Sequence, residues 1–231
     1  MSEWTKLTAQ DGHELSAYIA RPEGAPVGTL IVIQEIFGVN SHIRSVADSY
    51  AKEGYLCVAP ALFDRIERDL QLSYSPDDMK KAFNLYPQLK PDLSILDVAA
   101  AGQKATELAP GKKLGVIGFC YGGLVTWVSA TRGPKVGLHP SACACFYPGG
   151  IGNVATEQPS CPVMIHFGAK DTHIGEDQVD AVRNAHPDVQ IFVYEGAGHA
   201  FNRDPDPNAY SPDAARLARE RTLAFFKQNL A

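Results

Sequence analysis

The chain lacks the sequence signals of exported and membrane-spanning proteins. None of the apolar runs in its 231 residues approaches the ~20 residues that a membrane helix needs. The first fifteen residues, MSEWTKLTAQDGHEL, contain no basic stretch followed by an apolar one, which a secretory signal peptide would have. The sequence therefore predicts a cytoplasmic protein that does not bind membranes.

The cysteines and histidines form no recognisable metal or disulfide pattern. The five cysteines are an odd number, contain no C-x-x-C pair and have no regular spacing; they are Cys57, Cys120, Cys143, Cys145 and Cys161. Small disulfide-stabilised domains and structural zinc sites both need such patterns. The zinc motif H-E-x-x-H is also missing. We expect no metal and no cofactor.

The charge balance is slightly acidic, with 21 Lys and Arg against 26 Asp and Glu and a net charge of −5. A chain of this charge has no general basic surface for nucleic acid. With 45% hydrophobic and 20% charged residues it has the composition of a folded protein and can bury a sizeable core. No repeat or low-complexity segment divides the chain, so we expect residues 1–231 to form a single domain.

Short buried runs alternate with helical patterns along most of the sequence. Six apolar, β-branched runs predict strands, at residues 29–33, 55–59, 114–119, 142–147, 162–167 and 189–194. Six stretches with helical spacing follow or precede them, at 41–53, 75–86, 92–108, 121–131, 175–185 and 211–230. Buried parallel strands need such helical crossovers. The pattern predicts an α/β fold with a mostly parallel sheet and helices on both faces.

A glycine-rich turn follows the predicted strand at residues 114–119. It reads Gly-Phe-Cys-Tyr-Gly around Cys120, and a helical pattern begins directly afterwards. This is the G-x-S-x-G nucleophile elbow with cysteine in place of serine. A thiol at a helix N-terminus gains from the helix dipole, which lowers its pKa from about 8.5. Cys120 is the candidate nucleophile.

The same turn has a second interpretation. In a non-catalytic α/β module the glycines would let a small anionic ligand approach the helix N-terminus, and Cys120 would be a small buried residue. The turn has no Walker lysine and no complete G-x-G-x-x-G after the first strand. Alkylation of Cys120 in preference to the other cysteines would distinguish the enzyme from the binding module.

A cysteine nucleophile needs a base and an acid that orients the base. Asp171 follows the strand at 162–167, and His199 follows the strand at 189–194. Both come after Cys120, in the chain order of this elbow type, and all three lie at carboxyl ends of parallel strands. His173 is a rival to His199 because it lies two residues from Asp171. His166 lies within a predicted strand and is expected to be an interior residue.

The loop after the first buried strand supplies further candidates. In this fold an oxyanion hole uses the amide after the nucleophile and an amide of this loop, which assigns it to the backbone N–H groups of Tyr121 and Ile36. Glu35 is expected beside the thiol, where a carboxylate can take or hold its proton. The alternative for Glu35 is a carboxylate that faces solvent.

These motifs together resemble the dienelactone hydrolase family, a cysteine branch of the α/β-hydrolases. The matching segments are residues 34–38, 55–60, 118–123, 166–171 and 198–201, in the family's order. The resemblance implies an α/β-hydrolase fold, a Cys–His–Asp triad and a glutamate that partners the resting thiol. It also implies hydrolysis of a small ester or lactone through a thioester acyl-enzyme.

The resemblance also bears on the substrate. Family members that act on dienelactone bind its carboxylate with two arginines, and Arg203 matches one of them. The second should lie within residues 75–86, which contain no arginine. Lys80 or Lys81 could replace it there as a point charge, although lysine cannot form the bidentate contact of an arginine. Arg203 has an alternative role in local ion pairs with the neighbouring aspartates. Gln34 and Tyr147, each at a strand end, are expected to border the substrate, as are the loops at 148–161 and 200–210. The protein is expected to be a monomer or small homo-oligomer.

Overall fold

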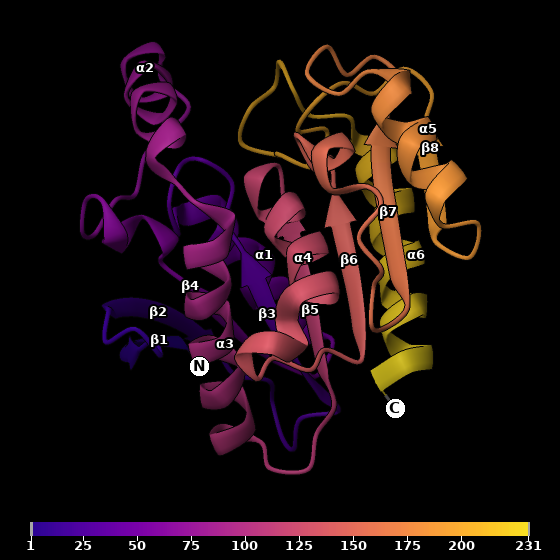
Figure 1. Cartoon of the computed structure of the whole chain (residues 1–231). Coiled ribbons are helices and arrows are strands. Elements are labelled where there is room, and N and C mark those ends of the chain that lie inside the picture. The colour runs from indigo at the N-terminus through magenta and orange to yellow at the C-terminus, as the bar shows by residue number, and fades with distance from the viewer. Residues whose placement is uncertain (1, 231) are drawn as a thin grey trace.

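The structure, a computed structural model, describes residues 2–230 and contains one eight-stranded sheet (Figure 1). The strand order is β1-β2-β4-β3-β5-β6-β7-β8. Strands β1 and β2 are antiparallel to their neighbours, and every pairing from β4 to β8 is parallel. The bounds are β1 (Ser2–Thr8), β2 (Glu14–Ala20), β3 (Gly28–Ile33), β4 (Tyr55–Pro60), β5 (Leu114–Phe119), β6 (Ala142–Phe146), β7 (Val163–Gly168) and β8 (Gln190–Tyr194).

Helices cover both faces of this sheet. Helices α1 and α6 pack on one face, and α3 and α4 pack on the other (Figure 1). The helices are α1 (Ser41–Lys52), α2 (Pro76–Leu85), α3 (Pro91–Leu108), α4 (Tyr121–Arg132), α5 (Glu176–Ala185) and α6 (Pro212–Leu230). Four 3-10 helices join them, η1 (Leu62–Arg65), η2 (Tyr86–Gln88), η3 (Gly133–Val136) and η4 (Ile151–Val154).

The burial of the strands explains why their sequences are continuously apolar. Every residue of β3, β4, β6 and β7 is buried, because helices cover both faces of the central sheet. The edge strand β1 is mostly exposed and mixes polar with apolar residues. Helix α2 has an exposed outer surface and extends away from the sheet at the upper left of Figure 1.

The sequence-based prediction of the fold is confirmed. The six predicted strands and six predicted helices are all present, with ends that differ by at most one residue. The N-terminal segment, expected to form a hairpin before the first buried strand, forms the antiparallel pair β1 and β2. The 3-10 helices were not predicted. Helix starts follow the expected capping: the side chains of Asn40 and Ser75 accept hydrogen bonds from the backbone N–H groups of Ile43 and Asp78.

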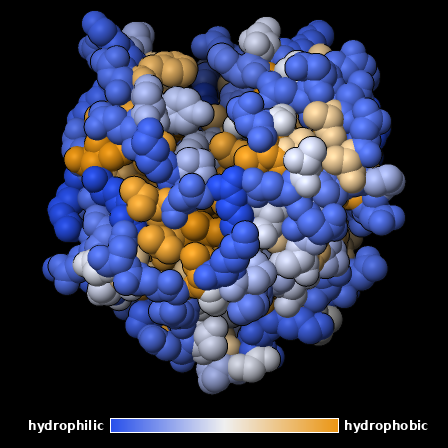
Figure 2. All heavy atoms as spheres, viewed as in Figure 1, coloured by the Kyte–Doolittle hydropathy of each residue, from blue (hydrophilic) through white to orange (hydrophobic). Residues whose placement is uncertain are grey.

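The surface is mainly polar, with apolar patches on the side that carries α2 and α3 (Figure 2). Phe83 of α2 and Leu93 of α3 are among the exposed large apolar side chains. Within residues 2–230, no helix combines the length and the apolar character needed to cross a membrane.

Candidate active site

Cys120 lies at a strained turn between β5 and α4. Its backbone φ and ψ are 54° and −115°, a conformation that non-glycine residues rarely adopt. The strained backbone is held in place by a hydrogen bond of 3.0 Å from the Cys120 N–H to the carbonyl of Phe146 on the adjacent strand. The thiol is partly exposed, whereas the residues on either side are buried. The turn therefore presents the sulfur at the surface of the sheet's carboxyl edge.

Two glycines make this turn possible. A Cβ atom on Gly118 would lie 2.1 Å from the carbonyl oxygen of Gly122. A Cβ atom on Gly122 would lie 2.4 Å from the carbonyl oxygen of Gln34, in the loop after β3. Both distances are too short for any side chain, so the close passage of α4 past β5 and the β3 loop requires glycine at both positions.

His199 and Asp171 form a hydrogen-bonded pair beside the turn. The Nδ1 atom of His199 lies 2.7 Å from Oδ2 of Asp171, whose side chain is buried. The other carboxylate oxygen accepts hydrogen bonds from the backbone N–H groups of His173 and Ile174, at 2.8 and 3.1 Å. These bonds fix the carboxylate, and the carboxylate in turn fixes the orientation of the imidazole.

The surroundings of His199 favour its protonated form. Burial alone would lower the pKa of this imidazole, but hydrogen bonds to Asp171 and to Cys120 and the charges of both groups raise it to about 10. The structure thus brings Cys120, His199 and Asp171 together in the order that the sequence predicted. An imidazolium beside the sulfur stabilises a thiolate.

The rival histidines occupy other positions. His173 packs edge-on against His199, with ring centroids 5.0 Å apart, and its backbone N–H binds Asp171. His166 is fully buried in β7 and lies within hydrogen-bond distance of the hydroxyls of Tyr194 and Thr222. Burial lowers the pKa of His166 to about 3, so this histidine is neutral. Its prediction as an interior residue is confirmed.

The two predicted oxyanion amides are available to a ligand. Tyr121 is the first residue of α4, and no side chain caps this helix start. Within residues 2–230, neither the Tyr121 N–H nor the Ile36 N–H is hydrogen-bonded to an acceptor. A side-chain contact helps to fix the start of α4, because the hydroxyl of Tyr121 lies 2.8 Å from that of Ser94 on α3.

Glu35 forms a buried ion pair with Arg203. The guanidinium Nε lies 3.0 Å from Oε2 of Glu35, and Nη2 lies 3.1 Å from Oε1. The Glu35 side chain is only 1% exposed, so the solvent-facing alternative is wrong. Arg203 also donates to Asp206 at 3.3 Å, which is the local ion pair that the sequence left open.

Aromatic rings enclose the guanidinium of Arg203. Its central carbon lies 4.9 Å from the ring centroid of Phe37 and 4.7 Å from that of Tyr74. Cation–π contacts of this kind stabilise a guanidinium that has lost its water. Two aromatic rings and the Glu35 carboxylate therefore hold the Arg203 guanidinium, and its side chain is buried inside the protein.

Tyr147 lies at the end of β6 with a backbone φ of 36°. Its ring packs against His199, with ring centroids 5.1 Å apart. The side chain is completely buried, and its hydroxyl has no hydrogen-bond partner within the described residues. Burial and then the charge of Glu35 raise the pKa of Tyr147, so the phenol stays protonated and remains a donor.

The remaining predicted residues have structural partners. The side chain of Gln34 is buried; its oxygen accepts a hydrogen bond from the Leu62 N–H at 3.1 Å, and its nitrogen donates to the carbonyl of Glu35 at 3.4 Å. Gln34 thereby supports the loop that carries Glu35. Lys81 is exposed and pairs with Glu67 at 2.6 Å.

Sequence reasoning missed the aromatic residues around the site. Phe37 and Tyr74 enclose Arg203, and Tyr86 packs edge-on against Tyr121 with centroids 5.8 Å apart. Burial and then the charge of Cys120 raise the pKa of Tyr86. The Tyr86 hydroxyl is therefore close enough to the nucleophile to interact with its charge. The only signal in the sequence was the position of Tyr74 and Tyr86 at the two ends of the 75–86 helix segment.

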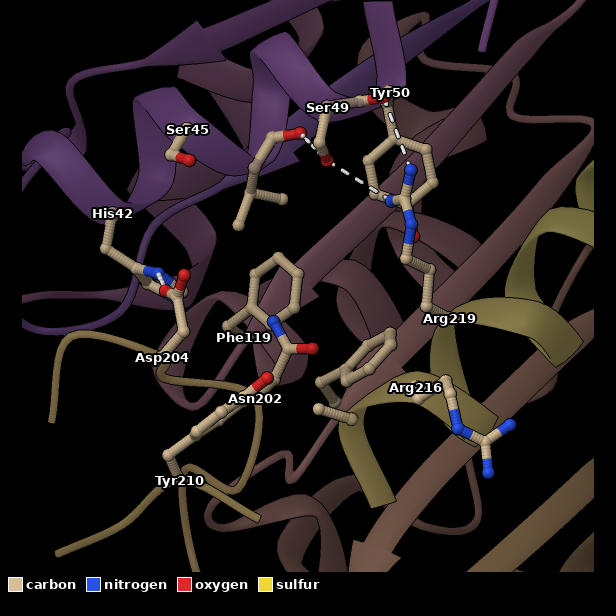
Figure 3. A pocket seen from close by; sticks show the side chains of 13 residues that line it. His42, Ser45, Ser49, Tyr50, Phe119, Asn202, Asp204, Tyr210, Arg216 and Arg219 are labelled. Carbon is tan, nitrogen blue, oxygen red and sulfur yellow. Dashed lines mark hydrogen bonds and ion pairs between the residues drawn. The ribbon is translucent and has the colours of Figure 1, made fainter. Parts of the chain in front are cut away.

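A separate hollow of about 350 Å³ lies between α1, α6 and the loop that follows His199 (Figure 3). None of the three triad residues lines it. At its edge, Nδ1 of the buried His42 lies 2.9 Å from Oδ1 of Asp204. This contact ties the loop to α1 immediately after Arg203, which helps to direct Arg203 toward Glu35.

Residues 2–230 contain no group of three or more His, Cys, Asp and Glu side chains arranged to hold a metal ion.

Comparison with known proteins points to one family. The profile of the dienelactone hydrolase family matches residues 15–230. A protein of Yersinia pestis named "Putative carboxymethylenebutenolidase" is 34% identical over 236 residues, covering 94% of this chain and 85% of its own. The crystal structure of a "Putative Dienelactone Hydrolase" from Klebsiella pneumoniae is 30% identical, covers 99% of both chains and superposes with a TM-score of 0.83.

A more distant structure agrees in fold. An alpha-beta serine hydrolase homologue from Coxiella burnetii is 19% identical, with a TM-score of 0.67 over 99% of this chain and 97% of its own. Together with the strand order and the helices on both faces, these likenesses identify the architecture as the α/β-hydrolase fold.

Proposed function

The chain belongs to the dienelactone hydrolase family and is a carboxylic ester hydrolase, and on this basis we propose that Cys120, His199 and Asp171 hydrolyse a small ester or lactone through a thioester. One observation carries the proposal. The His199–Asp171 pair, with its 2.7 Å hydrogen bond, lies beside a partly exposed cysteine at a nucleophile elbow. A purely structural cysteine needs neither the strained backbone nor the imidazole.

The first half-reaction forms the acyl-enzyme. His199 holds the proton of Cys120, and the thiolate attacks the carbonyl carbon of the substrate, forming the S–C bond. The carbonyl oxygen becomes an oxyanion, which accepts hydrogen bonds from the free N–H groups of Ile36 and Tyr121. As the intermediate collapses, the C–O bond of the ester breaks and His199 donates its proton to the leaving oxygen.

The second half-reaction releases the acid. A water molecule gives a proton to His199 and attacks the thioester carbonyl, so the S–C bond breaks and the thiolate is restored. Asp171 keeps the imidazole oriented and stabilises its positive charge in both halves. From a lactone, the ring opens in the first half-reaction and the leaving oxygen stays attached to the acyl group as a hydroxyl.

The ion pair of Arg203 with Glu35 affects how a substrate that carries a carboxylate can bind. Its guanidinium already binds Glu35 and Asp206, and it is 6% exposed. A substrate carboxylate that uses Arg203 has to compete with Glu35 for it. The comparison of p-nitrophenyl esters with and without a free carboxylate tests this: a higher kcat/KM for the acidic ester indicates that Glu35 gives way, and equal values indicate that the ion pair stays closed.

The non-catalytic alternative does not agree with membership of a hydrolase family. The direct test is the variant Cys120→Ala with p-nitrophenyl acetate as substrate. We expect kcat/KM to fall by about a thousand-fold or more, while the circular dichroism spectrum stays unchanged. The matched control is Cys161→Ala, another partly exposed cysteine outside the elbow, which should keep its activity. Wild-type hydrolysis by Cys120→Ala would overturn the proposed triad.

A further inference from the structure

Two other cysteines form a close pair on the opposite edge of the sheet from the elbow. Cys143 is the second residue of β6, and Cys161 lies two residues before the start of β7. Their sulfur atoms are 3.8 Å apart, and both thiols are free. Because parallel strands share a direction, these strand beginnings lie away from the strand ends that carry Cys120 and His199 (Figure 1).

Backbone hydrogen bonds position both cysteines of this pair. The N–H of Cys143 donates to the carbonyl of Pro162 at 3.0 Å, and Cys143 pairs with Val163 in the parallel ladder. Just before Cys161, the backbone N–H and the hydroxyl of Ser160 both donate to the carbonyl of Ala130, at 2.8 and 2.7 Å. These backbone hydrogen bonds therefore fix the positions of both cysteines, and the contact between their sulfur atoms does not depend on mobile loops.

The two thiols differ in access and in acidity. Cys161 is partly exposed, whereas Cys143 is completely buried. The hydrogen bond with Cys143 lowers the pKa of Cys161, against the effect of its partial burial. Burial raises the pKa of Cys143. Cys161 is thus the thiol that reagents can reach, and Cys143 is its buried neighbour at 3.8 Å.

A disulfide between them needs only a small movement. The sulfurs have to approach from 3.8 Å to about 2.05 Å, a change of the size that side-chain rotation provides. Strand pairing already places Cys143 beside Val163, two residues after Cys161, so the strands themselves need not separate. The bond would close a loop that contains η4 and the segment 148–160, which begins next to Tyr147.

We propose that Cys161 and Cys143 form a dithiol site that a hydroperoxide oxidises to a disulfide. In the first step the Cys161 thiolate attacks the peroxide: an S–O bond forms, the O–O bond breaks, and the departing alkoxide takes a proton to leave as an alcohol, or as water from hydrogen peroxide. In the second step the Cys143 sulfur attacks Cys161: the S–S bond forms, the S–O bond breaks, and hydroxide leaves with the Cys143 proton as water. Two thiols lose two electrons and the peroxide gains them.

The experiment uses Cys120→Ala, so that the nucleophile of the elbow does not react. After hydrogen peroxide treatment, intact mass spectrometry should show the loss of two hydrogen atoms, reversed by dithiothreitol. Peptide mapping should join Cys143 to Cys161. The matched double variant Cys120→Ala/Cys161→Ser should show no such loss. In Cys120→Ala/Cys143→Ser, Cys161 should stop at the sulfenic acid and be labelled by dimedone.

Three outcomes would overturn the proposal: no mass change under peroxide, a disulfide that joins any other pair, or Cys161 oxidised to its sulfinic acid while Cys143 is intact. The dimedone experiment reports on Cys161 even if the Cys161→Ser variant fails to fold. None of these readouts depends on ester hydrolysis, so a failure of the dithiol proposal can be distinguished from a failure of the proposed triad.

Discussion

The guanidinium of Arg203 binds the carboxylate of Glu35 through two nitrogens, at 3.0 and 3.1 Å, although 168 residues separate them in the chain. The pair joins the loop after β3 to the loop after β8, on either side of the elbow. Both side chains are buried, with 7% and 1% of their surfaces exposed. Glu35 depends on this bidentate contact, because without Arg203 its carboxylate would be a buried charge with neither water nor an ion-pair partner within the described residues.

Removing one partner of the Arg203–Glu35 ion pair should therefore destabilise the protein more than removing both. We expect Arg203→Ala to lower the free energy of unfolding by about 3–5 kcal/mol, because it leaves the Glu35 carboxylate buried and unpaired. The double variant Arg203→Ala/Glu35→Gln, which has no such charge, should recover part of this loss. Urea denaturation of the wild type, Arg203→Ala, Glu35→Gln and the double variant measures the coupling.

Arg216 is the matched control for this experiment. Its side chain is 62% exposed and pairs with Asp213 and Glu220 on the surface of α6. Arg216→Ala should change the free energy of unfolding by about 0–1 kcal/mol. A loss for Arg203→Ala as small as that for Arg216→Ala would show that water reaches the Glu35 site.

The second prediction concerns the glycines of the elbow turn. Gly122→Ala should destabilise the protein by more than about 3 kcal/mol or prevent folding, because its Cβ would lie 2.4 Å and 2.5 Å from the carbonyl oxygens of Gln34 and Ile33. Gly149→Ala is the control, since a Cβ there meets no atom within 4 Å. The control should stay within about 0.5 kcal/mol of the wild type in thermal or urea unfolding. A tolerated Gly122→Ala would mean that α4 can move away from the β3 loop.

The elements of the fold were predictable because local patterns encode them. The continuous apolar strands and the alternation with helices identify a covered parallel sheet, and Gly-x-Cys-x-Gly identifies the turn to α4. Asp171 and His199 were predictable for the same reason, since each follows a strand whose end is fixed by the sheet.

The pairings of side chains were not predictable. The sequence offered Arg203 the neighbouring aspartates or a substrate, and no local pattern shows that its strongest contacts are Glu35 and two aromatic rings from distant loops. Likewise Cys143 and Cys161 have no motif between them, and they meet only because β6 and β7 are neighbours in the sheet. Such contacts depend on how the loops pack over the sheet, which sequence periodicity does not describe.

Tyr147 provides a third prediction, which separates stability from substrate binding. Its buried hydroxyl has no protein partner within residues 2–230, so burial carries a desolvation cost without a compensating bond. Tyr147→Phe should therefore raise the free energy of unfolding by about 1 kcal/mol. If the hydroxyl binds substrate, kcat/KM should fall in the same variant. A destabilised Tyr147→Phe would indicate that the hydroxyl has a bonding partner in the folded protein.

The last prediction concerns the ionisation of His199. Its pKa lies at about 10 in the folded protein, above its ordinary value of 6.5, because bonds to Asp171 and Cys120 outweigh the lowering effect of burial. The charged imidazole therefore stabilises the fold fully below pH 6.5, and this contribution declines between pH 6.5 and about 10. In Asp171→Asn the carboxylate charge is gone while burial remains, so the pKa of His199 should fall.

NMR titration of the imidazole resonances from pH 5 to 11 measures this change directly. In the wild type the His199 signal should move near pH 10, and in Asp171→Asn it should move at a lower pH. His166 is an internal reference, because burial keeps its pKa at about 3 and its signal should stay constant over this range. Unfolding measurements should agree: the stability advantage of the wild type over His199→Gln should shrink as the pH rises from 6.5 to 10. A wild-type His199 that titrates near 6.5 would contradict this prediction, since the bonds to Asp171 and Cys120 would then not outweigh the effect of burial.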